Sequence, residues 1–300
     1  MIRENTLIIK STLKIASTIK ANAVMIHVDP LDDLYYEERI AKNLNIILIS
    51  RSKSRKLKNT DETKKTLSSY ANSYITLPKI QLTRIALIKV ATTLGLSKDL
   101  VNPGDKIVFC VGPNNVGILD LIHIVDTSKE SEITGKGVTK LAEAVKPELF
   151  QTVLNLVVEL ADKGREGKPI GTIFVVGDHE KVLQLSKQMI MNPFKGYDEE
   201  ERNIMQSSIK ETVREFAAMD GAFVIGDDGT ILTAGRYLGA AINESTLPRG
   251  LGTRHFAAAG ITALTKAIAF VISESSGDVR IFKDGKIMMH IEKGPGKNNQ

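Results

Sequence analysis

The chain is poor in cysteine, because Cys110 is the only one among 300 residues. A single cysteine excludes an intramolecular disulfide. Cys110 lies in the apolar run 107–111, so we expect a buried strand residue rather than a nucleophile. This composition fits a protein of a reducing cytoplasm.

Long apolar runs are also missing. No segment approaches the roughly 18 uncharged apolar residues that a membrane-spanning helix needs. Residues 1–5 lack the basic start and apolar stretch of a secretory signal. We therefore expect a cytoplasmic protein without a membrane partner.

Several common catalytic motifs are absent as well. The sequence contains no Walker-type phosphate loop, no GxGxxG pattern, no HExxH pair and no serine nucleophile elbow. The five histidines are scattered, which argues against a dedicated zinc site. The enzyme classes that depend on these motifs are not indicated.

The overall composition is that of a globular protein. Hydrophobic residues make up 42% and charged residues 25% of a chain long enough for two domains. The net charge of +5 is only mildly basic. The densest basic run, 51–58, lies in an expected loop without interleaved aromatic residues, which argues against a nucleic-acid partner. A basic surface would also attract anionic nucleotides.

The N-terminal part alternates helix-like and strand-like segments, which predicts a layered α/β domain with a mostly parallel sheet over residues 1–126. The polar stretch 127–140 is rich in serine, threonine, glycine and lysine and is interpreted as an interdomain linker. The predicted helices are 12–20, 33–43 and 80–96, with a weakly helical polar segment at 59–72, and the predicted strands are 23–28, 46–49, 107–111 and 121–125.

The C-terminal part, residues 141–300, has a different pattern. Helical spacing predicts helices over 147–162, 180–191 and 198–218, and an apolar run predicts a strand over 170–176. Two Asp-Gly turns, at 228–229 and 284–285, indicate β-hairpins. Hairpins beside helices predict a mixed sheet flanked by helices.

Three polar turns carry the candidate chemistry: 220–222 (Asp-Gly-Ala), 252–255 (Gly-Thr-Arg-His) and 273–277 (Ser-Glu-Ser-Ser-Gly). Together they offer carboxylates for a divalent cation and cationic and hydroxyl donors for phosphate oxygens. The second turn precedes an expected helix, whose free backbone N–H groups favour an anion.

Each turn also has an alternative reading when it is taken alone. Asp-Gly is a common turn, and the Gly252 turn could be a helix cap with a surface arginine. Glu274 could be an exposed acid entering a turn. Tyr237 and Leu238 are candidates for an adenine platform, although a core role is the default for Leu238.

Taken together, the three turns resemble the diadenylate cyclase (DAC, DisA_N) domain family. That family has a DGA motif, an RHR-type motif within GTRHR, and a following SEE-type turn ending in glycine. The runs 167–178 and 192–194 also resemble this domain, especially its archaeal branch. The resemblance covers about residues 140–300. More weakly, the N-terminal part resembles the α/β C-terminal domain of pyruvate kinase, a likeness of fold that implies no kinase chemistry.

The resemblance implies an enzyme that condenses two ATP molecules into cyclic di-AMP and releases two pyrophosphates. It implies that Asp220, Arg254 and His255 are catalytic. It also implies a divalent metal at Asp220 and Glu274, with Mn²⁺ favoured and Mg²⁺ or Co²⁺ as alternatives. The implied ATP-binding residues are Gly221, Ala222, Tyr237, Leu238, Gly252, Thr253, Ser273 and Glu274.

The sequence departs from the family pattern at three positions. Phe256 stands where many relatives have a second arginine, Ser275 replaces the second acid of the SEE turn, and Met219 stands where some relatives carry a histidine. These departures bear on the metal shell and on the triphosphate contacts.

The family geometry also implies a partner. Each domain binds one ATP, so ring closure needs two facing domains and a homo-oligomer that is at least a dimer. The alternative hypothesis is a module that senses ATP or cyclic di-AMP without turnover. A nucleic-acid-binding protein is a third hypothesis, which rests on net charge alone.

Overall fold

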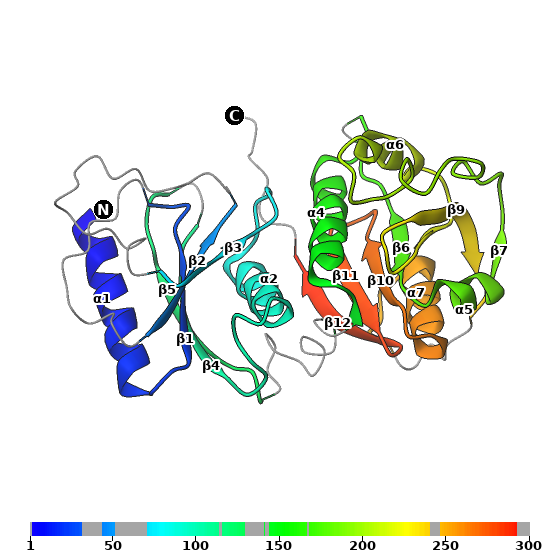
Figure 1. The fold of residues 1–300 in the computed structure, drawn as a ribbon. Helices are drawn as coiled ribbons and strands as arrows, with labels where there is room; N and C mark the ends of the chain where they lie inside the picture. Colours follow the sequence, from blue (N-terminus) through cyan, green and yellow to red (C-terminus); the bar gives the residue numbers. More distant parts are fainter. Residues whose placement is uncertain are drawn as a thin grey trace. The chain divides into compact units, whose positions relative to one another are not determined.

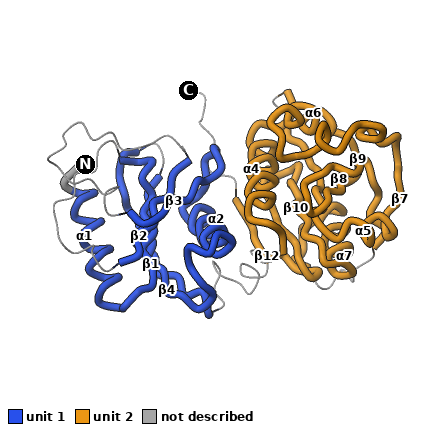
Figure 2. The backbone as a smooth tube through the Cα atoms, viewed as in Figure 1, with its two compact units in different colours: residues 1–135 blue, residues 136–300 orange. Residues whose placement is uncertain are grey.

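The computed structural model describes residues 2–31, 44–51, 71–113, 116–129, 141, 144–166, 168–240 and 247–292. The chain divides into two compact units, residues 1–135 and 136–300 (Figure 2). The predicted helix 33–43, nearly all of the segment 59–72 and residues 130–140 of the predicted linker lie outside the described residues. The predicted domain limits at 126 and 141 therefore stay a prediction.

Unit 1 contains a five-stranded sheet in the order β3-β2-β1-β4-β5. The first four of these strands are parallel, and β5 pairs antiparallel with β4 at the edge. This confirms the predicted α/β class with a mostly parallel sheet. The strands are β1 (Ala23–His27), β2 (Asn45–Ser50), β3 (Ser73–Thr76), β4 (Lys106–Val111) and β5 (Leu121–Asp126).

Two helices cover opposite faces of this sheet (Figure 1). Helix α1 (Ile2–Thr18) packs Ile9 and Leu13 against the face that carries Val24 and Ile26. Helix α2 (Arg84–Ser97) meets the other face, because Gly95 approaches Met25 and Ile75. Neighbouring strand residues point to opposite faces, and helices cover both faces. The central strands therefore read as continuous apolar runs.

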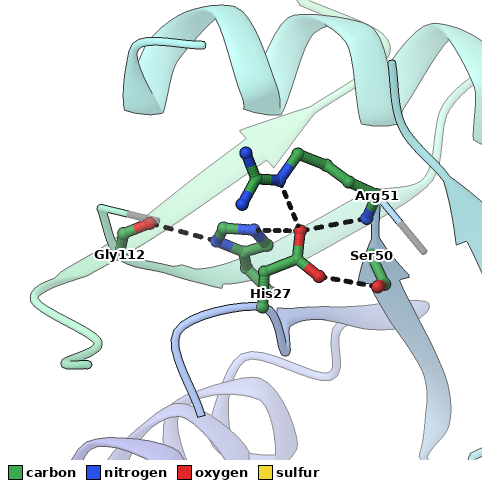
Figure 3. Close-up of polar contacts among 5 residues, drawn as sticks. His27, Ser50, Arg51 and Gly112 are labelled. Carbon is green, nitrogen blue, oxygen red and sulfur yellow. Dashed lines mark hydrogen bonds and ion pairs between the residues drawn. The ribbon is translucent and has the colours of Figure 1, made fainter. Parts of the chain in front are cut away.

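A buried polar cluster joins the carboxyl ends of β1, β2 and β4 (Figure 3). The Asp29 carboxylate accepts hydrogen bonds from Ser50 Oγ at 2.6 Å and from the backbone N and Nε of Arg51 at 2.9 and 3.0 Å. His27 donates from Nδ1 to the Gly112 carbonyl at 3.0 Å, and its Nε2 lies 3.3 Å from Asp29 Oδ2. Burial acts to raise the Asp29 pKa, but the hydrogen bonds outweigh it and hold that pKa well below its usual range.

Unit 2 contains a seven-stranded mixed sheet in the order β12-β11-β10-β6-β8-β9-β7. Only β6 and β8 are parallel neighbours, and the other pairs are antiparallel. This confirms the predicted mixed sheet and both hairpins. The strands are β6 (Thr172–Val176), β7 (Ser186–Gln188), β8 (Ala222–Ile225), β9 (Ile231–Leu238), β10 (Ile268–Ile272), β11 (Val279–Lys283) and β12 (Lys286–Ile291).

Two helices flank the unit 2 sheet. Helix α4 (Pro147–Lys163) covers one face, where the rings of Phe150 and Phe270 lie 5.6 Å apart. Helix α7 (Thr253–Leu264) packs Ala258 and Ile261 into the apolar cluster on the other face. None of the helices in the described part of the chain is long and apolar enough to cross a membrane.

Two of the helices predicted in unit 2 are shorter in the structure than predicted. The predicted helix 180–191 ends early as α5 (His179–Gln184), and the chain then forms β7, which pairs with β9. The predicted long helix 198–218 contains only α6 (Ile209–Phe216). Residues before α6 bind the β8–β9 hairpin instead, because Arg202 Nη1 donates to the Ile231 carbonyl at 3.1 Å. Contacts with another element therefore outweighed helix propensity.

Candidate functional site

The three polar turns meet at one edge of the unit 2 sheet. Asp220 precedes β8, whereas Glu274 follows β10. Strands β6 and β8 are parallel, and β10 runs antiparallel to β6. The carboxyl end of β10 therefore lies beside the amino ends of β6 and β8. Helix α7 begins at the same place and brings Arg254 to it.

Arg254 joins the two carboxylates of the site. Its Nη1 lies 3.0 Å from Glu274 Oε2, and its Nη2 lies 3.7 Å from Asp220 Oδ1. The Asp220 and Glu274 side chains are 76% and 62% exposed, so both remain accessible to a ligand. The structure thus brings together one residue from each predicted turn.

Gly171 makes room for this arrangement at the start of β6. A Cβ atom at this position would lie 2.6 Å from Arg254 Nη1 and 3.0 Å from Glu274 Cβ. Gly171 is not among the site residues predicted from the sequence. A glycine at the start of a strand is the signal that could have identified it, because it indicates a close approach by another group.

A cavity of about 430 Å³ opens on the Asp220 side of Arg254, and we call it the apolar-walled cavity. Of the predicted residues, it is lined by Asp220, Gly221, Ala222, Tyr237, Leu238, Thr253 and Arg254. Phe256, Met189 and Arg236 also line it. Its size and its mixture of apolar walls with a few charged groups suit a small organic ligand.

Gly221 fixes the local chain path beside this cavity. Its φ is +101°, a conformation that other residues rarely adopt, and an added Cβ would lie 2.6 Å from the Gly235 carbonyl carbon. The glycine of this turn therefore lets β8 pack closely against β9. Ala222 is fully buried at the start of β8, so it contributes backbone rather than a polar side chain to the wall.

A second cavity, of about 630 Å³, lies on the Glu274 side, and we call it the polar cavity. Arg254 and Thr253 line both cavities, so they stand at the boundary. Gly252 is the N-cap residue of α7, and no side chain of the described residues accepts a hydrogen bond from the first backbone N–H groups of this helix. These N–H groups are therefore available to an anion. The polar cavity is further lined by Gly252, His255, Ser273, Glu274 and Arg280.

His255 is 5% exposed and serves as a neutral group near neutral pH. Burial and, after it, the positive charge of Arg280 lower the pKa of His255 to about 4. Its Nε2 lies 3.4 Å from Arg280 Nη1. Because a guanidinium only donates, Nε2 is the acceptor and the ring proton resides on Nδ1. His255 can therefore position its neighbours but does not add a positive charge to the site.

The donor set suits a metal that is bound together with a ligand. Among the residues that the structure describes, no group of three or more histidine, cysteine, aspartate and glutamate side chains could hold a metal ion. Asp220 and Glu274 supply two exposed carboxylates. Mg²⁺-type cations are commonly held by one or two carboxylates together with substrate phosphates and water, so the two residues fit that mode.

Comparisons with known proteins identify relatives of this chain. Residues 159–287 match the family model described as DisA bacterial checkpoint controller nucleotide-binding (DAC). The chain is 36% identical to the diadenylate cyclase of Methanocaldococcus jannaschii, covering 70% of this chain and 67% of the relative. It is 33% identical to the diadenylate cyclase of Haloferax volcanii, covering 74% and 81%. Both matches are longer than unit 2, so they extend into unit 1.

Solved structures are also similar over part of the chain. A crystal structure of DacA from Staphylococcus aureus matches with 25% identity and a TM-score of 0.32, covering 47% of this chain and 84% of that one.

Proposed function

Because the chain belongs to the diadenylate cyclase family and is a nucleotidyltransferase, we propose that it condenses two ATP molecules into cyclic di-AMP and two pyrophosphates. The observation that carries the proposal is the placement of Arg254, which contacts Asp220 and Glu274 and stands between the two cavities. A cytoplasmic location goes with this proposal.

The two cavities suit the two ends of one ATP. The apolar-walled cavity would take the adenine and ribose, with Tyr237 and Leu238 beside the base and Gly221 and Ala222 along the sugar. The polar cavity would take the phosphates, which Thr253, Ser273 and the start of α7 bind through hydroxyl and backbone N–H groups. Arg254 would then face the α-phosphate at the boundary.

The bond-forming step would follow from that position. The 3′-hydroxyl oxygen of one ATP attacks the α-phosphorus of the other, and pyrophosphate leaves in line. Asp220 orients this hydroxyl and accepts its proton. Arg254 stabilises the charge that develops on the α-phosphoryl oxygens, while His255 holds the adjoining loop. Repeating the step with the roles of the nucleotides exchanged closes the ring and releases the second pyrophosphate.

A divalent metal belongs to the proposal. Asp220 and Glu274 would hold it together with phosphate oxygens, and it would supply charge neutralisation and a lower pKa for the attacking hydroxyl. Mn²⁺ is our first choice, with Mg²⁺ and Co²⁺ as the alternatives.

Incubation with ATP and Mn²⁺, followed by chromatography, tests the proposal. We expect cyclic di-AMP from the unaltered chain and a loss of at least roughly a hundred-fold in Asp220→Asn, because the base and a metal ligand are removed together. Asp227→Asn is the matched control, since this exposed aspartate lies in the turn at the other end of β8. An equal loss in both variants would contradict the role of Asp220.

A nucleotide-sensing module is the second candidate. It is favoured by the presence of only one acid, Glu274, in the last turn and by Phe256 at the position after His255. Binding of ATP by the unaltered chain with no cyclic product under any of the three metals would select this candidate over the enzyme.

A further inference from the structure

We propose that Arg280 is a second phosphate-binding cation, which holds the terminal phosphates of the nucleotide in the polar cavity. This proposal rests on the proposed function and deepens it, because none of the three polar turns contains Arg280. The residue lies on β11 and lines the polar cavity with Thr253, Arg254, Ser273 and Glu274.

The guanidinium of Arg280 is held in place by two contacts, and some of its N–H donors remain available to a ligand. Its side chain is 16% exposed, and it contacts Asp278 Oδ2 from Nη2 at 3.5 Å and His255 Nε2 from Nη1 at 3.4 Å. Both distances are long for hydrogen bonds. An arginine carries five N–H donors, so three have no hydrogen-bond acceptor among the described residues. A partly buried guanidinium with spare donors on a cavity wall is suited to a phosphate group.

The charges of the cavity support a second cation. Arg254 is engaged with both Asp220 and Glu274, which offset its charge. Arg280 contacts one carboxylate among the described residues, Asp278, which also lies 3.0 Å from His290 Nε2. Arg280 is therefore less fully neutralised by its neighbours than Arg254, which contacts two carboxylates. A triphosphate carries several negative charges, and Arg254 together with one divalent metal would still leave a net negative charge on it.

Phe256 explains why the second cation comes from another element. The side chain that follows His255 in α7 is a phenylalanine, and it lines the apolar-walled cavity rather than the polar one. Helix α7 thus brings a single arginine to the phosphates. Arg280, on the neighbouring hairpin, supplies the other from across the polar cavity.

The test compares two ligands that differ only at the phosphate end. Calorimetric titrations with AMP and with α,β-methylene ATP, which cannot release pyrophosphate, give two affinities for each variant. In Arg280→Gln we expect the affinity for the ATP analogue to fall roughly ten- to hundred-fold, the effect of losing a charged hydrogen-bond donor. The affinity for AMP should change less than about two-fold, because AMP does not reach the terminal-phosphate position.

Lys286→Gln is the matched control, because it removes one positive charge from the exposed start of β12 in the same hairpin. Both affinities should be unchanged in this variant. Arg280→Lys keeps the charge but loses the planar fork, so a smaller loss for the ATP analogue is expected. If Arg280→Gln does not fold, as judged by circular dichroism, the ratio of the two affinities in Arg280→Lys decides the question.

An equal loss of affinity for both ligands, or no loss for either, overturns the proposal, because a merely structural role would not distinguish them. The outcome is separate from that of the proposed function. Failure of the unaltered chain to make cyclic di-AMP would refute the enzyme but leave the affinity ratio readable. If the unaltered chain makes cyclic di-AMP and the Arg280 variants keep the same ratio of affinities for the ATP analogue and for AMP, only the role of Arg280 is refuted.

Discussion

At the scale of single residues, the site depends on the absence of a side chain at Gly171. The missing side chain leaves room for the Arg254 guanidinium, which would otherwise be 2.6 Å from a Cβ atom. The flexible Arg254 side chain can move away from an added methyl group, whereas Glu274 Cβ, at 3.0 Å, needs to shift by only a few tenths of an ångström. The geometry of the site should therefore be more sensitive to this position than the stability of the fold.

Gly171→Ala is expected to reduce the rate of cyclic di-AMP formation by roughly ten-fold or more, since about 1 Å of misplacement can cost that much or more. The melting temperature should change little, and both quantities are measured on the same preparation. Gly226→Ala is the matched control, because its Cβ would meet a side-chain oxygen, Asp228 Oδ1, at 2.7 Å, and Gly226 follows the carboxyl end of β8, away from Arg254. Equal activity of the two variants would show that Gly171 has no special part in placing Arg254.

The residues that the sequence identified and those it missed differ in a physical way. Asp220, Arg254 and Glu274 lie in motifs whose order and spacing are visible along the chain, and the structure brings them together. Gly171 and Arg280 act through contacts with residues far away in the sequence. A lone arginine in an alternating strand is usually read as a solvated residue, so the pattern of β11 gave no indication of the polar cavity.

At the scale of elements, strands and hairpins were better predicted than helix lengths. Continuous apolar runs identified β1, β4 and β6, because burial on both faces leaves an unambiguous pattern. The segment 198–208 has helical spacing, but its polar groups bind the β8–β9 hairpin, as when Ile204 N donates to the Gly229 carbonyl at 2.9 Å. Such a competition between local and distant partners cannot be read from one segment alone.

The cluster around Asp29 predicts how unit 1 responds to acid. The pKa of Asp29 is lower in the folded chain than its unfolded value of about 3.9, so the folded state favours the carboxylate. Its contribution to stability is complete above that unfolded value and is lost as the pH falls through the folded pKa. Unit 1 should therefore begin to lose stability below about pH 4, because the unfolded chain then binds a proton that the folded Asp29 still excludes.

Asp29→Asn should remove this contribution at neutral pH and destabilise unit 1 by about 2 kcal/mol, because hydrogen bonds to a charged acceptor are lost or weakened. Hydrogen exchange measured by mass spectrometry can resolve the effect: amides of β1, β2 and β4 should exchange faster, whereas those of unit 2 should not. Asp105→Asn, at a turn before β4, is the control. Unchanged exchange in Asp29→Asn would show that the cluster adds no net stability.

At the scale of the whole molecule, the exposure of the site argues for a second copy of the chain. Asp220 is 76% exposed, and Tyr237, beside the predicted adenine position, is 60% exposed. A cavity of about 430 Å³ has room for the base and sugar of one nucleotide, not two. We therefore propose that the α-phosphate attacked by the bound 3′-hydroxyl comes from a nucleotide held by another chain.

This requirement predicts how activity depends on assembly. Specific activity should fall on dilution below the dissociation constant of the dimer, while binding of one ATP analogue per chain should persist. Constant specific activity in a preparation that sedimentation shows to be monomeric would contradict it.

Mixing unaltered and altered chains gives a sharper measurement, because a ring needs two bonds and each bond needs the Asp220 of one chain. When unaltered chains and Asp220→Asn chains are equilibrated in equal amounts, random pairing leaves about a quarter of the dimers able to close the ring. Cyclic product should therefore fall to about a quarter of the all-unaltered rate, whereas independently acting chains would give about half. The mixed dimers, with one competent aspartate, should release the linear once-joined dinucleotide, which chromatography separates from the ring.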